Sequence, residues 1–182
     1  MRIITAACLL LFSAFAFTDE QSSLLNKLVP TLEKWGSDPI LVAAVKQQNA
    51  LNITLDSIKV RDAEWRIYDG VDEQMQALMS NPAAKKLLEM EQTEAFYFEL
   101  FLMDNQGANV AMTNKTSDYW QGDEAKWKQS YNDGKGAVHI GDVEFDESAQ
   151  DYLVQISVPI KDGEATIGAL TIGVNLDILE SQ

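Results

Sequence analysis

Apolar residues recur at steps of three and four through the first half of the chain, which is the spacing of one face of a helix. Residues 22–35 carry such a stripe, and Pro30 within it predicts either one kinked helix or two short ones. Asp38 followed by Pro39 is typical of a helix start, because the carboxylate can cap free amides and proline fits the first turn. We therefore expect residues 17–92 to be a helical region.

The second part of this region is less regular. Residues 54–70 show no clean period and are expected to form a loop or a short helix. Residues 71–90 return to helical spacing, and Asn81-Pro82 within them is expected to restart the helix by the same cap-and-proline arrangement.

Extended runs replace the helical spacing in the second half of the chain. Residues 95–114 read as a hairpin around the polar turn 104–107, and residues 152–174 read as a second hairpin around the turn 161–164. A further strand over residues 137–145 would complete an antiparallel sheet of about five strands.

The first strand of the second hairpin alternates most clearly. Its apolar positions are Tyr152, Val154, Ile156, Val158 and Ile160. Because alternate side chains point to opposite faces of a strand, we expect one buried face here. Helices followed by strands predict an α+β fold with the sheet over residues 95–176, rather than an alternating α/β fold.

The N-terminus has the composition of a targeting segment. Met1-Arg2 precedes an apolar run, and Ala14-Phe15-Ala16 fits the small-x-small cleavage pattern. The run falls short of the roughly 20 residues that a membrane-spanning helix needs. We expect residues 1–16 to be a secretory signal peptide and residues 17–182 to be a single periplasmic domain that does not span the membrane. Retention of the segment as an anchor is the alternative.

Charge and rare residues exclude several functions. A formal net charge of −14 at pH 7 disfavours nucleic acid as a partner. Cys8 is the only cysteine and lies in the signal segment, so no disulfide is expected. His139 is the only histidine, which argues against a zinc site and a serine-histidine triad. We expect no cofactor, no bound metal and no enzymatic activity.

Residues 116–131 combine large aromatic side chains with charged and amide ones. The aromatic residues are Tyr119, Trp120, Trp127 and Tyr131. Asp123 is expected to cap a short helix over residues 123–131, on which Lys126 and Trp127 share a face with it. This face either packs on the sheet while its charged ends reach water, or forms the wall of a small-molecule pocket.

The order of these elements resembles a known family. A hairpin, a short helix with the step Lys126-Trp127, a strand leading into the turn FDES (145–148), and a final strand IGALTIGV (167–174) resemble the Cache family of extracytoplasmic sensors, also called PDC domains. The resemblance covers residues 38–176. It implies a single Cache domain, with a PAS-like antiparallel sheet preceded by a long N-terminal helical region.

The resemblance also implies a ligand site. By comparison with members that bind amino acids, Trp127 would be a platform, Lys126 would contact an anionic group and Asp146 a cationic one. Tyr119, Trp120, Asp123 and Tyr131 would line or orient the site, with Trp127 and Tyr131 facing inward and Tyr119 and Trp120 at the mouth. Lysine replaces the arginine usual in the family, so bidentate recognition of a carboxylate is lost. The neighbouring acids Asp142 and Glu144 are expected on a solvated strand edge rather than around calcium.

We therefore expect an exported sensor module that captures a small polar metabolite: an amino acid, an amine or a short carboxylate. Its expected signalling partner is a separate membrane-bound histidine kinase, cyclase or chemoreceptor. The alternative is a ligand-free interaction module that docks on a membrane receptor through exposed Tyr119 and Trp120.

Overall fold

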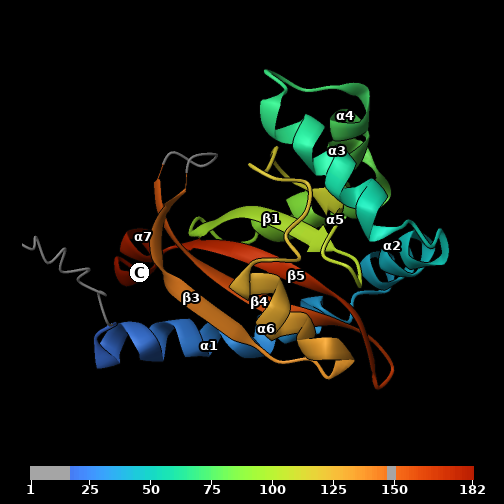
Figure 1. Cartoon of the computed structure of the whole chain (residues 1–182). Helices are drawn as coiled ribbons and strands as arrows, with labels where there is room; N and C mark the ends of the chain where they lie inside the picture. Colours follow the sequence, from blue (N-terminus) through green and yellow to red (C-terminus); the bar gives the residue numbers. More distant parts are fainter. Residues whose placement is uncertain (1–16, 147–150) are drawn as a thin grey trace, which may run out of the picture.

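The computed structural model describes residues 17–146 and 151–182. The predicted signal peptide, residues 1–16, and residues 147–150 lie outside the described residues. The α+β prediction is confirmed, because helices come first and a five-stranded antiparallel sheet follows (Figure 1). Within the described ranges, no helix is both long and apolar enough to cross a membrane.

The strands lie in the order β2-β1-β5-β4-β3. They are β1 (Tyr97–Met103), β2 (Asn109–Met112), β3 (His139–Asp146), β4 (Asp151–Asp162) and β5 (Ala165–Asn175). Both predicted hairpins are present, since β1 pairs with β2 and β4 pairs with β5. The predicted additional strand is β3, which pairs with β4 and forms one edge of the sheet.

Most helices precede the sheet. They are α1 (Asp19–Trp35), α2 (Pro39–Ala50), α3 (Leu55–Ile67), α4 (Glu73–Ser80) and α5 (Pro82–Glu91), with α6 (Ala125–Tyr131), the 3₁₀ turn η1 (Asn132–Gly134) and α7 (Leu176–Glu180) following later. Asp38 and Asn81 cap α2 and α5 as predicted, because each side-chain oxygen accepts a hydrogen bond at 2.8 Å from a first-turn N–H. Helix α1 continues through Pro30 as one helix.

Helix α3 is longer and more regular than the sequence pattern suggests. It spans 13 residues where the sequence allowed a loop. Its inward positions are Ile58, Asp62 and Trp65, which follow helical spacing but place an acid in the middle of the buried stripe. A charged residue in the apolar stripe obscures the helical period in the sequence. The Asp62 carboxylate can be buried there because the folded chain supplies its hydrogen-bond partners.

The sheet buries side chains on both faces. On one face, helices α1, α2 and α5 cover an apolar core to which β4 contributes Val154, Ile156, Val158 and Ile160. On the other face, Ser157 and Thr171 are fully buried, and their hydroxyl oxygens are 2.8 Å apart. The prediction of one buried face is therefore incomplete. Tyr152 is 61% exposed near the start of β4, where its ring contacts Phe145.

The second face carries its own apolar cluster at the end near α3 and α4. Its buried members are Ile58, Trp65, Met75, Phe101, Met103, Ala108, Met112, Tyr119 and Ala169. The other part of this face lies under α6 and beside β3, as Figure 1 shows.

Candidate functional site

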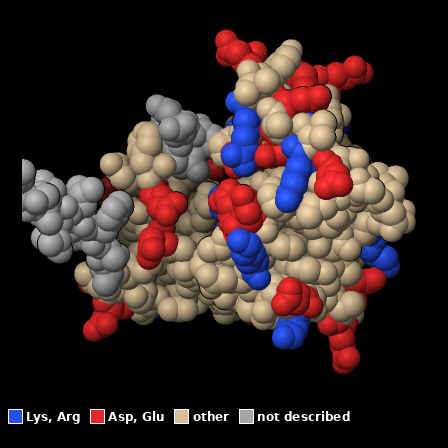
Figure 2. Space-filling model, in the orientation of Figure 1, with Lys and Arg blue, Asp and Glu red and all other residues tan. Residues whose placement is uncertain are grey.

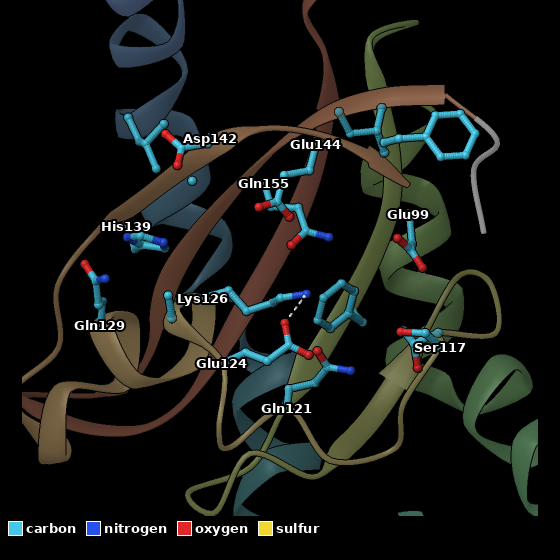
Figure 3. A pocket seen from close by; sticks show the side chains of 17 residues that line it. Glu99, Ser117, Gln121, Glu124, Lys126, Gln129, His139, Asp142, Glu144 and Gln155 are labelled. Carbon is cyan, nitrogen blue, oxygen red and sulfur yellow. Dashed lines mark ion pairs between the residues drawn. The ribbon is translucent and has the colours of Figure 1, made fainter. Parts of the chain in front are cut away.

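A cavity of about 750 Å³ lies on the second face of the sheet. Its lining comes from β1, β3, β4, α6 and the loop of residues 116–124, as Figure 3 shows. Acidic and basic side chains gather side by side between α3 and α6 on the face seen in Figure 2. The volume falls within the range of roughly 300–1,000 Å³ that is usual for small-molecule sites.

The register of the sheet determines which strand residues reach the cavity. Phe101, Thr171, Ser157 and His139 occupy successive partner positions across four strands, so they share one face. Phe101 and His139 line the cavity at opposite sides of this row. At Gly173 the backbone of β1 comes so close that an added Cβ would lie 2.7 Å from the Phe98 carbonyl oxygen.

Glu99 lies at an irregularity in β1 and faces the cavity together with Phe101, two residues further along the strand. The pairing of β1 with β5 shifts between Phe98 and Leu100, and Glu99 has a positive φ of 39°. A positive φ is unfavourable for a residue with a Cβ. Glu99 is 4% exposed and lines the cavity. Strained, buried acids of this kind are typical of functional positions.

An ion pair at the start of α6 forms another part of the wall. Lys126 Nζ is 2.9 Å from Glu124 Oε2, and both residues line the cavity. The same ammonium lies 5.4 Å from the centre of the Phe101 ring. Helix α6 begins at Ala125 with Glu124 as N-cap and no side-chain capping bond, so the prediction of Asp123 as the cap is wrong. The Glu124 carboxylate pairs with Lys126 instead.

Gln121 and Thr116 form the most buried polar part of the lining. Thr116 Oγ1 accepts a hydrogen bond from Asn109 and donates one to the Asp118 carbonyl at 2.7 Å. Gln121 is 1% exposed, and its Nε2 donates to the same carbonyl at 3.0 Å. Its Oε1 is buried and has no hydrogen-bond partner among the described residues. An unpaired buried acceptor is costly unless a ligand or water donor fills the position.

Helix α3 holds this loop from the other side. Asp62 Oδ1 accepts hydrogen bonds from the backbone N–H groups of Tyr119 and Trp120, both at 2.9 Å. The Trp65 indole donates to the Thr116 carbonyl at 2.8 Å. The loop that carries Gln121 is therefore positioned by side chains from a distant part of the chain.

Strand β3 contributes His139, Asp142 and Glu144 to the rim. Burial lowers the pKa of the His139 imidazole below its usual range, and the Asp142 carboxylate partly opposes this effect. The imidazole is therefore neutral at pH 7. Asp142 and Glu144 are exposed, as expected for an edge strand, but they also border the cavity. Among the described residues, no group of three or more His, Cys, Asp or Glu is placed to hold a metal ion.

The predicted ligand-binding residues are largely separate from this cavity. Lys126 lines it, whereas the side chain of Asp146 lies outside the described part of the chain. Trp127 and Tyr131 stack on each other with ring centres 5.0 Å apart, and neither is among the lining residues. The Trp127 indole donates to the Asp104 carbonyl at 2.9 Å, so this ring fastens α6 to the β1–β2 turn.

The remaining predicted residues also have structural contacts. Tyr119 is 4% exposed and packs on Trp65, so the prediction that it is an exposed docking residue is wrong. Trp120 is partly buried, and its indole donates to the Gln106 carbonyl at 2.7 Å. Asp123 is exposed and is not among the lining residues. Backbone carbonyls that the sequence pattern does not reveal therefore hold Trp120 and Trp127 in place.

Sequence reasoning missed several lining residues, among them the buried polar residues Glu99 and Gln121. The sequence does single out Glu99, because it is the one charged residue within the apolar strand YFELFLM. Gln121 had none, since its burial depends on contacts with distant elements.

Comparisons with known proteins support the fold. No family model matches the sequence, and no curated protein matches it either. The extracellular domain vpHK1S-Z8 of a proposed histidine kinase is similar in structure, with a TM-score of 0.52 and 10% identity over 89% of this chain and 54% of that chain. Its similarity concerns the fold alone.

Two further structures are more distant. The sensor domain of the histidine kinase DctB from V. cholerae has a TM-score of 0.39 and 14% identity, over 90% of this chain and 57% of that chain. The ligand-binding domain of the chemoreceptor Tlp3 from Campylobacter jejuni, in complex with 4-methylisoleucine, has a TM-score of 0.42 and 12% identity, over 92% of this chain and 64% of that chain. This chain therefore spans between half and two thirds of the chains it resembles.

The helical region, the strand order and the similarity to the first of these structures define the fold. The chain has the PAS-like fold of Cache, or PDC, sensor domains.

Proposed function

We propose that this chain is the ligand-binding module of an extracytoplasmic sensor and that it captures a small polar metabolite in the cavity beside α6. The observation that supports this most strongly is the convergence of charged and amide side chains from β1, β3, α6 and the loop 116–124 on one cavity of about 750 Å³. Amino acids, amines and short carboxylates are the candidate ligands. In this proposal the ligand is bound and released without chemical change.

We further propose that residues 1–16 direct export to the periplasm and that the ligand-bound domain reports to a membrane-bound partner. A histidine kinase, a cyclase or a chemoreceptor would fit this role. The similarity to the extracellular domain vpHK1S-Z8 supports the fold on which this proposal depends.

Thermal unfolding of the exported protein in the presence of a metabolite panel tests the proposal. A ligand that binds only the folded state stabilises it by about 2.7 kcal/mol at one hundred times its dissociation constant. For a domain of this size that corresponds to a rise in Tm of roughly 5–10 °C. We expect one chemical class in the panel to give such a rise.

Two lysines of α6 provide a matched pair of variants. Lys126 lines the cavity, whereas Lys128 is exposed on the same helix and is not part of the lining. Lys126→Ala should change the affinity for the ligand, and Lys128→Ala should leave it unchanged. A broad panel without any stabilising compound, or equal effects of the two substitutions, would contradict the assignment of this cavity as the binding site.

A further inference from the structure

Acidic side chains outnumber basic side chains in the lining of the cavity. Among the described residues of the lining, the carboxylates are Glu99, Glu124, Asp142 and Glu144, and Lys126 is the one lysine or arginine. Its ammonium already pairs with Glu124 at 2.9 Å. His139 adds no positive charge at neutral pH, because burial lowers its pKa. The cavity therefore presents an excess of negative charge to a ligand.

The carboxylates stand at both ends of the cavity. Glu99 belongs to β1, whereas Asp142 and Glu144 belong to β3. The strand order places β5 and β4 between these two strands, which separates them by roughly 14 Å at the usual strand spacing. Figure 3 shows Glu99 and Asp142 at opposite sides, with Glu144 between them. In the described part of the chain, neither Asp142 nor Glu144 takes part in an ion pair.

An independent observation concerns the buried amide of Gln121. Its Nε2 donates to the Asp118 carbonyl, and a carbonyl can only accept, so the orientation of the amide is fixed. The oxygen Oε1 is therefore the atom left over. It lacks a partner within the described residues, and the side chain lies toward the cavity next to Glu124 (Figure 3). This position calls for a hydrogen-bond donor, which an ammonium group supplies and a carboxylate does not.

We propose that the cavity binds a small linear dication with a primary ammonium group at each end. One ammonium would lie near Gln121 and the adjoining carboxylates, and the other would lie near Asp142 and Glu144. This inference rests on the proposed function and specifies its ligand class.

The alternatives fit less well. A ligand carboxylate would have to separate Lys126 from Glu124 and would then meet the remaining negative charge. A zwitterion would satisfy one end of the cavity only. The net charge of −14 for the whole chain also raises the local concentration of cations rather than anions.

A four-carbon series tests the charge of the ligand at constant length. We would measure binding of 1,4-diaminobutane, butylamine, 4-aminobutyrate and butanedioate to the exported protein by isothermal titration calorimetry at low and moderate salt. The diamine should bind on the order of tenfold more tightly than butylamine, and its affinity should fall with added salt. Butanedioate should not bind.

The outcome separates this inference from the proposed function. If 4-aminobutyrate or butanedioate binds more tightly than the diamine, the assignment of a dication as the ligand is wrong, while the proposed sensor function stands. The same holds if none of the four binds but another metabolite in the broad panel does. If nothing in either set binds, both proposals fail.

Three substitutions locate the charges that matter. Glu144→Gln should weaken the binding of the diamine about tenfold and leave the binding of butylamine nearly unchanged. Glu164→Gln is the control, because it removes the same charge at the exposed β4–β5 turn and should change the affinity for neither compound. Lys126→Ala releases Glu124 and should strengthen diamine binding. Weaker diamine binding by Lys126→Ala, or equal effects of the two glutamate substitutions, would overturn the inference.

Discussion

The Asp62 carboxylate is expected to contribute more to stability than any exposed acid of α3. It is 7% exposed and accepts two backbone hydrogen bonds, from Tyr119 and Trp120 at 2.9 Å each. It also pairs with Arg66 at 2.8 Å. Asp62→Ala leaves two backbone N–H groups without an acceptor, and one unsatisfied buried group costs about 1–3 kcal/mol. Because the Arg66 pair is partly exposed and adds little, we expect a total loss of about 2–5 kcal/mol.

Urea unfolding followed by tryptophan fluorescence measures this loss. Asp62→Asn keeps an acceptor oxygen while it removes the charge, so it should cost only about 1 kcal/mol. Glu64→Ala is the control, since Glu64 is exposed on the same helix and makes only a long ion pair of 3.7 Å with Arg61. A loss for Asp62→Ala no larger than that for Glu64→Ala would refute the idea that this carboxylate anchors the loop.

Three further predictions concern packing, pH and export. Gly173→Ala should destabilise the fold by about 1–3 kcal/mol in urea unfolding, because the new methyl group would lie 2.7 Å from the Phe98 carbonyl oxygen and 2.8 Å from Leu153 Cδ1. Since the pKa of His139 is lower in the folded chain, the unfolded chain binds this proton at higher pH, and stability should fall as pH drops from about 7.5 to 5.5. His139→Gln should reduce this pH dependence in the same unfolding assay. Mass spectrometry of the exported protein should show a mature chain beginning at Phe17, whereas an intact N-terminus would indicate an anchor.

Elements with local signals could be predicted from the sequence. Asp38-Pro39 and Asn81-Pro82 located two helix starts, because capping and proline geometry act within a few residues. The hairpins were predicted for the same reason, since each combines two extended runs with a short polar turn. The sequence pattern does not define helix α3, because Asp62 interrupts its apolar stripe.

The cavity could not be predicted in the same way. Its lining combines residues far apart in the sequence, from β1, β3, β4, α6 and the loop 116–124. The aromatic residues of the segment 116–131 lie beside the cavity and are not among its lining residues. Trp120 and Trp127 donate their indole N–H groups to backbone carbonyls, so they fasten segments together beside the cavity.

Phe101 belongs to both parts of the second sheet face, the apolar cluster and the cavity. Its ring belongs to the apolar cluster under α3 and α4, and it also lines the cavity beneath Lys126. A ligand ammonium near Glu124 would compete with Lys126 for this carboxylate and would therefore change the contacts of a ring that is packed in the cluster. The loop carrying Gln121 is held by Trp65, a member of the same cluster, and by Asp62 on the same helix. Ligand binding and the packing of α3 against the sheet are therefore expected to be coupled, because both depend on the position of this loop.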